Sequence, residues 1–207
     1  MAYQSIWYIT NLPPKIIDII EEDLEQFKDN FQQSQLSGGA INTNKRNSKN
    51  TWIPESHWIS GFLWFYVDKA NRDNFRYDLT GIDGSNIQFT KYEQGEFYGW
   101  HNDQGVSSYY KPQGVPGISK DPKVLTDFLE INTECIRKLS FILQLSDPDS
   151  YEGGNVQLLD ENGKSYFVPR QKGTIIAFDS RTSHRVLKVT KGIRKSIVGW
   201  AVGPRWK

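Results

Sequence analysis

The chain has 207 residues, of which 24% are charged, and a formal net charge of +1. This length suits one domain with a sizeable core, and the near-neutral charge provides no overall field that would favour nucleic acid or an anionic membrane as partner. A lone cysteine, Cys135, excludes an intramolecular disulfide, and no basic and apolar leader is visible, so we expect a soluble, intracellular protein.

The first 85 residues are predicted to support the core. Residues 6–9 alternate as a short edge strand does. A helix is predicted to begin after Pro13, because apolar residues then recur at helical spacing. These residues are Ile16, Ile20, Leu24, Phe27 and Phe31. We expect this helix to lie on the outside of a sheet.

Two further segments complete this support. Residues 34–50 are polar, with almost no bulky apolar side chain, and predict an exposed loop without a functional role. From Trp52 to Ala70 the apolar pattern resumes at helical spacing and predicts a second helix that ends near Asn71. His57 at its start has no second ligand at strand spacing, so a structural role is favoured over metal binding.

After a predicted turn at residues 81–84, short apolar runs separated by turn residues dominate the chain. They predict strands at 87–92, 97–103, 138–145, 155–159, 166–169, 174–178, 184–189 and 194–202. Eight strands after two helices fit a double-sheet jelly roll. We therefore predict one domain over residues 1–207, mostly β with flanking α-helices, whose jelly-roll core occupies 86–203.

The segment from Gln104 to Lys120 is too long for an idle connection in a compact domain. It contains the doublet Tyr109-Tyr110 and starts directly after Asp103, which is a candidate metal ligand. This position favours a lid over plain disorder. Residues 121–135 then predict a helix with a packing role.

Two histidines and one carboxylate form the candidate site. His101 and Asp103 are two residues apart in a predicted strand, so both side chains point to the same face. His184 begins another β-branched run, and Arg194 follows it by ten residues. Two histidines with one carboxylate form a facial triad, which suits iron(II) and leaves open positions for a cosubstrate and dioxygen. Arg194 would then bind a dicarboxylate.

The ordered set of motifs resembles the iron(II)- and 2-oxoglutarate-dependent dioxygenases, in particular the prolyl 4-hydroxylase-like branch. The resemblance covers about half the chain, from Ile87 to Val202. Its motifs are Tyr92-x-x-Gly95, His101-x-Asp103, the run Arg137-Lys-Leu-Ser-Phe-Ile-Leu, Tyr151-Glu-Gly-Gly154, Gly173-Thr-Ile-Ile-Ala-Phe178, His184 and Arg194. The pattern is also similar to small hydroxylases encoded by bacterial viruses, which would place the protein in the cytoplasm of an infected bacterium.

The resemblance implies a role for each matched position. His101, Asp103 and His184 would be the catalytic iron ligands, Arg194 would bind 2-oxoglutarate, and dioxygen would be the second substrate. Tyr92 would lie beside the cosubstrate. Where some relatives carry a second tyrosine for the far carboxylate this chain has Gln144, and Ser196, two residues beyond Arg194, could replace that contact. L-ascorbate could serve as a reductant.

The implied activity is hydroxylation of a protein or peptide, at proline, with release of succinate and carbon dioxide. One alternative keeps the cofactors but oxidises a free amino acid or another small metabolite. Repair of alkylated nucleic acid is disfavoured, because Trp200 stands where such relatives place a further arginine. A non-catalytic jelly-roll binding module is disfavoured because all four site residues are retained.

Overall fold

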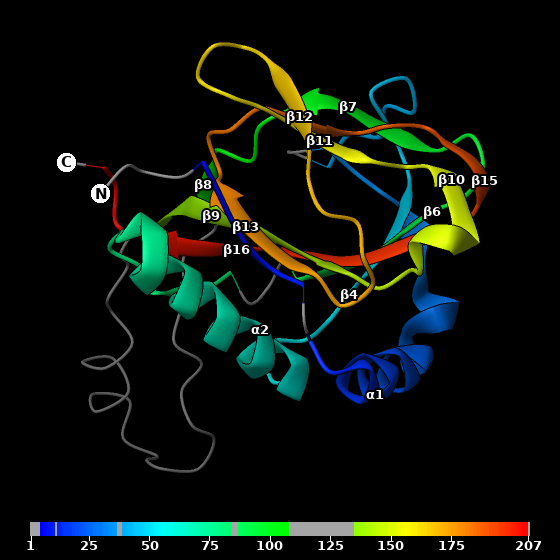
Figure 1. Ribbon diagram of the computed structural model, residues 1–207, viewed down its shortest axis with the longest axis horizontal. Helices are drawn as coiled ribbons and strands as arrows, with labels where there is room; N and C mark the ends of the chain where they lie inside the picture. Colours follow the sequence, from blue (N-terminus) through cyan, green and yellow to red (C-terminus); the bar gives the residue numbers. More distant parts are fainter. Residues whose placement is uncertain (1–4, 11, 37–38, 84–86, 108–134, 207) are drawn as a thin grey trace.

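Two β-sheets face each other, with helices on the outer side of the larger sheet (Figure 1). This computed structural model describes residues 5–10, 12–36, 39–83, 87–107 and 135–206. The predicted jelly roll is confirmed. No helix among these residues is long and apolar enough to cross a bilayer.

The larger sheet has nine strands. Along its main path it contains β1 (Ile6–Ile9), β13 (Ile175–Asp179), β9 (Cys135–Gln144), β16 (Arg194–Gly203), β6 (Gln88–Tyr92), β4 (Lys49–Trp52) and β2 (Gln32–Gln33). Two short strands join off this path: β5 (Gly81–Ile82) pairs with β16, and β8 (Val106–Ser107) pairs with β9. All of these pairings are antiparallel.

The smaller sheet carries the two histidine strands side by side. Its order is β12 (Ser165–Phe167), β11 (Val156–Leu159), β14 (His184–Val186), β7 (Phe97–His101) and β3 (Arg46–Asn47). A separate two-stranded ribbon pairs β10 (Tyr151–Gly153) with β15 (Val189–Gly192).

The helices cover the outer face of the larger sheet. They are α1 (Pro14–Leu24), the 3-10 turn Glu25–Asn30, α2 (Trp58–Ala70) and the π-helical turn Asn71–Phe75, and a further 3-10 turn occupies Pro148–Ser150. Both long helices bury an apolar stripe, for example Ile20 of α1 and Leu63 of α2, against residues of β9, β13 and β16. Burial of this stripe supplies the main apolar support of the sheet.

Alternation along β9 and β16 divides their residues between two environments. Leu139, Phe141 and Leu143 of β9 pack into the helix-facing core. Ile142 packs into a second core between the two sheets, and Gln144 is two residues further along the same face. The inner faces of both strands therefore carry polar residues into the space between the sheets.

Several predicted boundaries were wrong. The first helix does not continue to Phe31, because the chain tightens into a 3-10 turn after Leu24. The predicted second helix begins only at Trp58, since Lys49–Trp52 is the strand β4. The single strand predicted at 184–189 is two strands: β14 ends at Val186, and β15 then pairs with β10 in the ribbon.

The prediction of an exposed loop at 34–50 holds for residues 39–45 and was wrong for residues 46–50. This segment supplies β3 and the start of β4, and Arg46, Ser48 and Asn50 are all buried. The polar composition of the segment suggested exposure to solvent. These three residues are buried instead because the surface they cover is itself polar. The lid predicted at 104–120 and the helix predicted at 121–135 lie mainly outside the described residues.

Candidate metal centre

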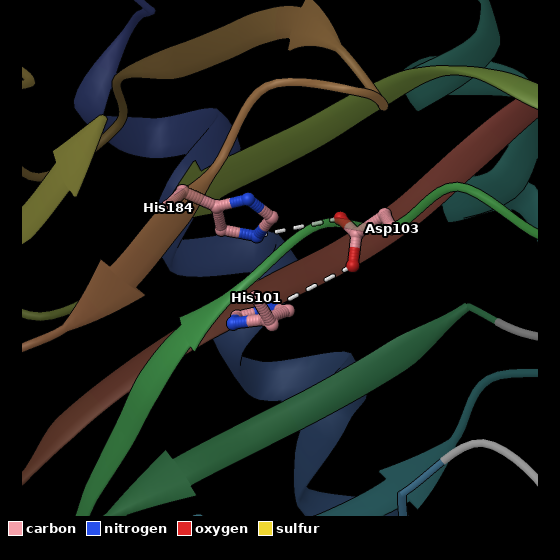
Figure 2. Close-up of side chains that lie close together, drawn as sticks. All are labelled: His101, Asp103 and His184. Carbon is pink, nitrogen blue, oxygen red and sulfur yellow. Dashed lines mark ion pairs between the residues drawn. The ribbon is translucent and has the colours of Figure 1, made fainter. Parts of the chain in front are cut away.

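The structure brings His101, Asp103 and His184 together at one end of the space between the sheets. His101 and His184 are direct cross-strand partners on β7 and β14. Their Nε2 atoms lie 3.7 Å and 3.4 Å from the two carboxylate oxygens of Asp103. Figure 2 shows the three side chains pointing toward one another, and one ligand atom from each lies within 4.8 Å of the others. This spacing allows all three to bind one ion.

Asp103 does not lie within the strand as predicted. β7 ends at His101, and the Asp103 N–H donates to the carbonyl of Ser180 at 2.9 Å. This bond links the chain after β7 to the turn before His184. The carboxylate therefore reaches the histidines from just beyond the strand end.

Backbone contacts set the tautomer of both histidines. Nδ1 of His101 lies 2.9 Å from the carbonyl oxygen of Gly99, and Nδ1 of His184 lies 3.0 Å from that of Thr182. A carbonyl can only accept a hydrogen bond, so each Nδ1 carries the proton. Each Nε2 then keeps its lone pair for a metal ion.

The protonation states also suit metal binding. Burial, together with the adjacent His184, lowers the pKa of His101 to about 3, so this imidazole is neutral at neutral pH. Burial works to raise the pKa of Asp103, but the two histidines and a hydrogen bond from Ser140 bring it below its usual value. The Ser140 hydroxyl donates to Oδ2 of Asp103 at 2.7 Å. The result is two neutral nitrogen donors and one carboxylate oxygen, a set that fits iron(II).

Arg194 is buried in the wall of the same space, with 2% of its surface exposed. Its Nη2 donates to Oε1 of Gln144 at 2.7 Å, and its Nη1 donates to the Ser196 hydroxyl at 3.2 Å. Both partners are neutral, and its Nε has no acceptor among the described residues. No described carboxylate forms an ion pair with it. Burying a cation is costly without a counter-charge, so this arginine is fitted to an anionic ligand.

Neighbouring residues fix the position of this guanidinium. Tyr92 is its cross-strand partner, with the ring centroid 5.6 Å from the arginine Cζ. Gly154 packs against the arginine stem in a left-handed conformation (φ 61°), and a Cβ there would lie 3.2 Å from Cδ of Arg194. The absence of a Cβ at this position therefore leaves room for the arginine stem.

One cavity of about 610 Å³ connects the triad with Arg194. It continues sideways over β6 and β4 toward β2. That extension is lined mainly by polar side chains, with one tryptophan: Gln32, Gln33, Asn50, Trp52, Gln88 and Thr90. The cavity is therefore larger than the triad alone requires.

Three contributors to the site were not assigned from the sequence. Ser140 holds Asp103, and the Tyr98 ring stacks on His101 with centroids 3.5 Å apart and planes at 14°. Burial raises the pKa of the Tyr98 hydroxyl to about 12, so it remains protonated. Arg46 also contacts the Tyr98 ring, with its Cζ 4.7 Å from the ring centroid. A polar residue inside the apolar run of β9 was the visible signal for Ser140.

Asp179 and His57 have structural roles, and for His57 this role was expected from the sequence. Asp179 accepts hydrogen bonds from the backbone and side chain of Arg181 and thereby shapes the turn that leads to His184. The Tyr77 hydroxyl donates to the same carboxylate at 2.6 Å. His57 caps α2, where its Nδ1 accepts from the Ile59 N–H at 3.4 Å. His57 belongs to no metal-binding group among the described residues.

Sequence comparisons point to one family. A profile of the 2OG-Fe(II) oxygenase superfamily matches residues 87–202, which is more than half of the chain. A PKHD-type hydroxylase of Parvibaculum lavamentivorans is 29% identical over 175 residues, 84% of this chain and 67% of that protein. A PKHD-type hydroxylase of a Synechococcus strain is 44% identical over 62 residues, 30% of this chain and 28% of that protein.

Solved structures show the same fold. A prolyl-4-hydroxylase of Pseudomonas putida is similar with a TM-score of 0.67 at 17% identity, covering 95% of this chain and 92% of that one. A prolyl hydroxylase of Trichoplax adhaerens, solved with a hypoxia-inducible-factor peptide, has a TM-score of 0.69 at 17% identity, covering 95% and 83%. At these identities the likeness supports the double-stranded β-helix fold.

The contact between Ser140 and Asp103 yields a test of the metal centre. Ser140→Ala should weaken iron(II) binding about 10- to 100-fold, because the carboxylate loses a hydrogen bond that orients it. The measurement is an anaerobic iron(II) titration. Ser150→Ala, which removes an exposed hydroxyl whose partner among the described residues is the Asp147 carbonyl, should leave the affinity unchanged. Equal affinities for both variants would show that Ser140 does not orient Asp103.

Proposed function

Because the chain belongs to the 2OG-Fe(II) oxygenase superfamily, we propose that it hydroxylates proline in a protein or peptide substrate. The enzyme class itself follows from the family: the chain is a 2-oxoglutarate- and iron(II)-dependent oxygenase. Its cofactors are therefore iron(II), 2-oxoglutarate and dioxygen. The assignment of proline is supported by relatives whose names describe prolyl hydroxylases.

In this proposal His101, Asp103 and His184 hold the iron. The support is the geometry of the three ligand atoms and the two backbone carbonyls that keep both Nε2 lone pairs free. With 2-oxoglutarate and dioxygen, the bound iron(II) would supply oxidation of a C–H bond to C–OH, with one oxygen atom entering the product and the other entering succinate as carbon dioxide is released. The three side chains would hold the ion from one side, and the cavity beside them would accept the cosubstrate.

Arg194 binds the far carboxylate of 2-oxoglutarate. The observation that carries the proposed function is this buried cation, which has only neutral partners among the described residues and shares the cavity of the triad. Gln144 and Ser196 hold the guanidinium by accepting from its two terminal nitrogens, and Tyr92 packs beside it. Gln144 and Ser196 therefore position the arginine. Tyr92 and Ser196 are in addition proposed to contact the cosubstrate directly.

A free amino acid or small metabolite is the second candidate substrate, because the polar extension of the cavity could hold a charged small molecule. Dealkylation of nucleic acid is not proposed: Trp200 stacks on Arg137 at 3.6 Å from Cζ to ring centroid, and it occupies the position of the arginine expected there. We include L-ascorbate as the reductant that keeps the bound iron ferrous.

We also propose a domain organisation and a cellular location for the protein. Residues 1–207 would form one domain, since β1 near the start pairs with β13 of the core and α1 packs on the same sheet. A cytoplasmic location, including that of a phage-infected bacterium, is proposed from the single buried free cysteine, Cys135, which is compatible with a reducing compartment.

Loss of Arg194 should separate cosubstrate binding from metal binding. Arg194→Ala should retain iron(II) but bind 2-oxoglutarate at least about 100-fold more weakly, because a buried charge pair broken on one side costs roughly 3–5 kcal/mol. Arg194→Lys should restore part of the affinity, since an ammonium offers a point charge without the paired geometry. The measurement is an anaerobic 2-oxoglutarate titration of the iron-loaded protein.

Lys191→Ala is the matched control, because this exposed lysine of β15 pairs with the exposed Glu152 and with no other carboxylate in the described part of the chain. It should bind 2-oxoglutarate like the unmodified protein. Unchanged affinity in Arg194→Ala would contradict the role proposed for this arginine.

The substrate class is tested by succinate release. The protein is incubated with iron(II), 2-oxoglutarate and ascorbate, and with proline-containing peptides, free L-proline or alkylated oligonucleotides. We expect proline-containing peptides to stimulate succinate release and to gain one oxygen atom by mass. Stimulation by free L-proline alone would favour the second candidate, and oxidation of the oligonucleotides alone would contradict both. His101→Ala serves as the inactive control.

A further inference from the structure

Arg46 is a second buried arginine in the catalytic cavity, with 8% of its surface exposed. Its side chain extends from β3 and makes three hydrogen bonds. Nε donates to the Ser48 hydroxyl at 3.1 Å, Nη1 to the Gln35 carbonyl at 3.0 Å and Nη2 to Oε1 of Gln88 at 3.0 Å. These contacts hold the guanidinium firmly in place.

All three partners are neutral, so the charge of Arg46 is not compensated. None of the described carboxylates forms an ion pair with it, whereas Arg72, Arg137 and Arg181 each pair with an aspartate. A guanidinium has five N–H groups, and the three bonds leave one free N–H on each terminal nitrogen. Two N–H groups on adjacent nitrogens match the two oxygens of a carboxylate.

The position of Arg46 places this free charge beside the reaction centre. Tyr98 lies between Arg46 and His101: the guanidinium covers the tyrosine ring at 4.7 Å, and the tyrosine stacks on the imidazole at 3.5 Å. Arg46, Tyr98 and His101 line the same cavity. An anion held by Arg46 would therefore be part of a molecule that reaches the metal centre.

The surroundings favour a monoanion. Arg137, another arginine that lines the cavity, is paired with Asp83 at 3.4 Å. No lysine lines the cavity among the described residues. Gln32, Gln33 and Asn50 line the same extension, and their amide groups can donate hydrogen bonds to a carboxylate. One uncompensated arginine among amides suits a single negative charge better than a phosphate dianion.

We propose that Arg46 binds a carboxylate of the substrate and so orients the substrate over the metal centre. This inference rests on the proposed function, because it assigns the polar extension of the cavity to the substrate and Arg194 to 2-oxoglutarate. The carboxylate can come from a free amino acid or from an acidic side chain of a peptide. Both sources present the same group to the guanidinium.

The test compares a charged with a neutral probe. N-acetyl-L-proline and N-acetyl-L-prolinamide are titrated calorimetrically into the anaerobic iron(II) protein with saturating 2-oxoglutarate, so that Arg194 is already occupied. The carboxylate probe should bind at least about tenfold more tightly than the amide, as expected for hydrogen bonds to a charged group. Arg46→Gln should abolish this preference, and Arg46→Lys should keep part of it.

Arg72→Gln is the matched control, because this exposed arginine pairs with Asp68 at the end of α2, and it should keep the full preference. Fold integrity is read from 2-oxoglutarate affinity, which should be the same in Arg46→Gln and the unmodified protein. If Arg46→Gln does not fold, Arg46→Lys decides: a preference for the carboxylate equal to that of the unmodified protein overturns the proposal, and a reduced one supports it.

Two further probes identify the source of the carboxylate. Free L-proline and the peptide acetyl-Pro-Asp-amide are titrated in the same way, and the true source is the one whose affinity falls in Arg46→Gln. The proposal is overturned if the unmodified protein binds 2-oxoglutarate but prefers no carboxylate probe, or if the preference survives in Arg46→Gln. Failure of 2-oxoglutarate to bind the iron-loaded protein would instead contradict the proposed function.

Discussion

Uncompensated positive charge inside a β-sandwich is the constraint on which the site depends. Arg194 is buried, yet among the described residues it contacts only neutral acceptors, Gln144 and Ser196. Burial lowers the pKa of its guanidinium, with Tyr151 and Tyr92 acting in the opposite direction. A fold that keeps such a cation must provide stability elsewhere, and here the apolar core beneath the larger sheet does so. The arrangement makes physical sense when an anion completes the cavity.

The alternation of strand residues connects that core to the site. Leu139 and Phe141 of β9 face the helices, while Ser140 between them reaches Asp103. On β16, Ile197 joins the helix-facing core, whereas Arg194 lies in the cavity wall. The same two strands thus contribute apolar contacts on one face and positioned polar groups on the other. Support from packed strands holds such groups more precisely than a loop would.

Sequence reasoning could find the residues whose chemistry is unusual for their position. A histidine two residues before an aspartate, a second histidine at a strand start and an arginine ten residues later are rare enough to stand out. The eight predicted strands after two helices led correctly to a jelly roll, and Ser196, two residues beyond Arg194, does lie beside it. The end of β7 was placed two residues late, because the bond from Asp103 to Ser180 lies outside the strand ladder and leaves no trace in residue type.

Arg46 could not be found in this way. It lies in a polar segment, and polar composition is typical of an exposed loop. Residues that line a polar cavity also lack apolar periodicity, although Ser48 and Asn50 are buried. The two situations differ only in three dimensions, where β3 pairs with β7 and brings Arg46 opposite Tyr98.

The central claim is that His101, Asp103 and His184 form a single iron site. It is tested most directly by the stoichiometry of iron(II) bound under anaerobic conditions, measured for the unmodified protein and for Asp103→Ala. The account predicts one iron per chain in the unmodified protein and loss of stoichiometric binding in the variant, with an unchanged fold by circular dichroism. Stoichiometric iron retained by a folded Asp103→Ala protein would contradict it.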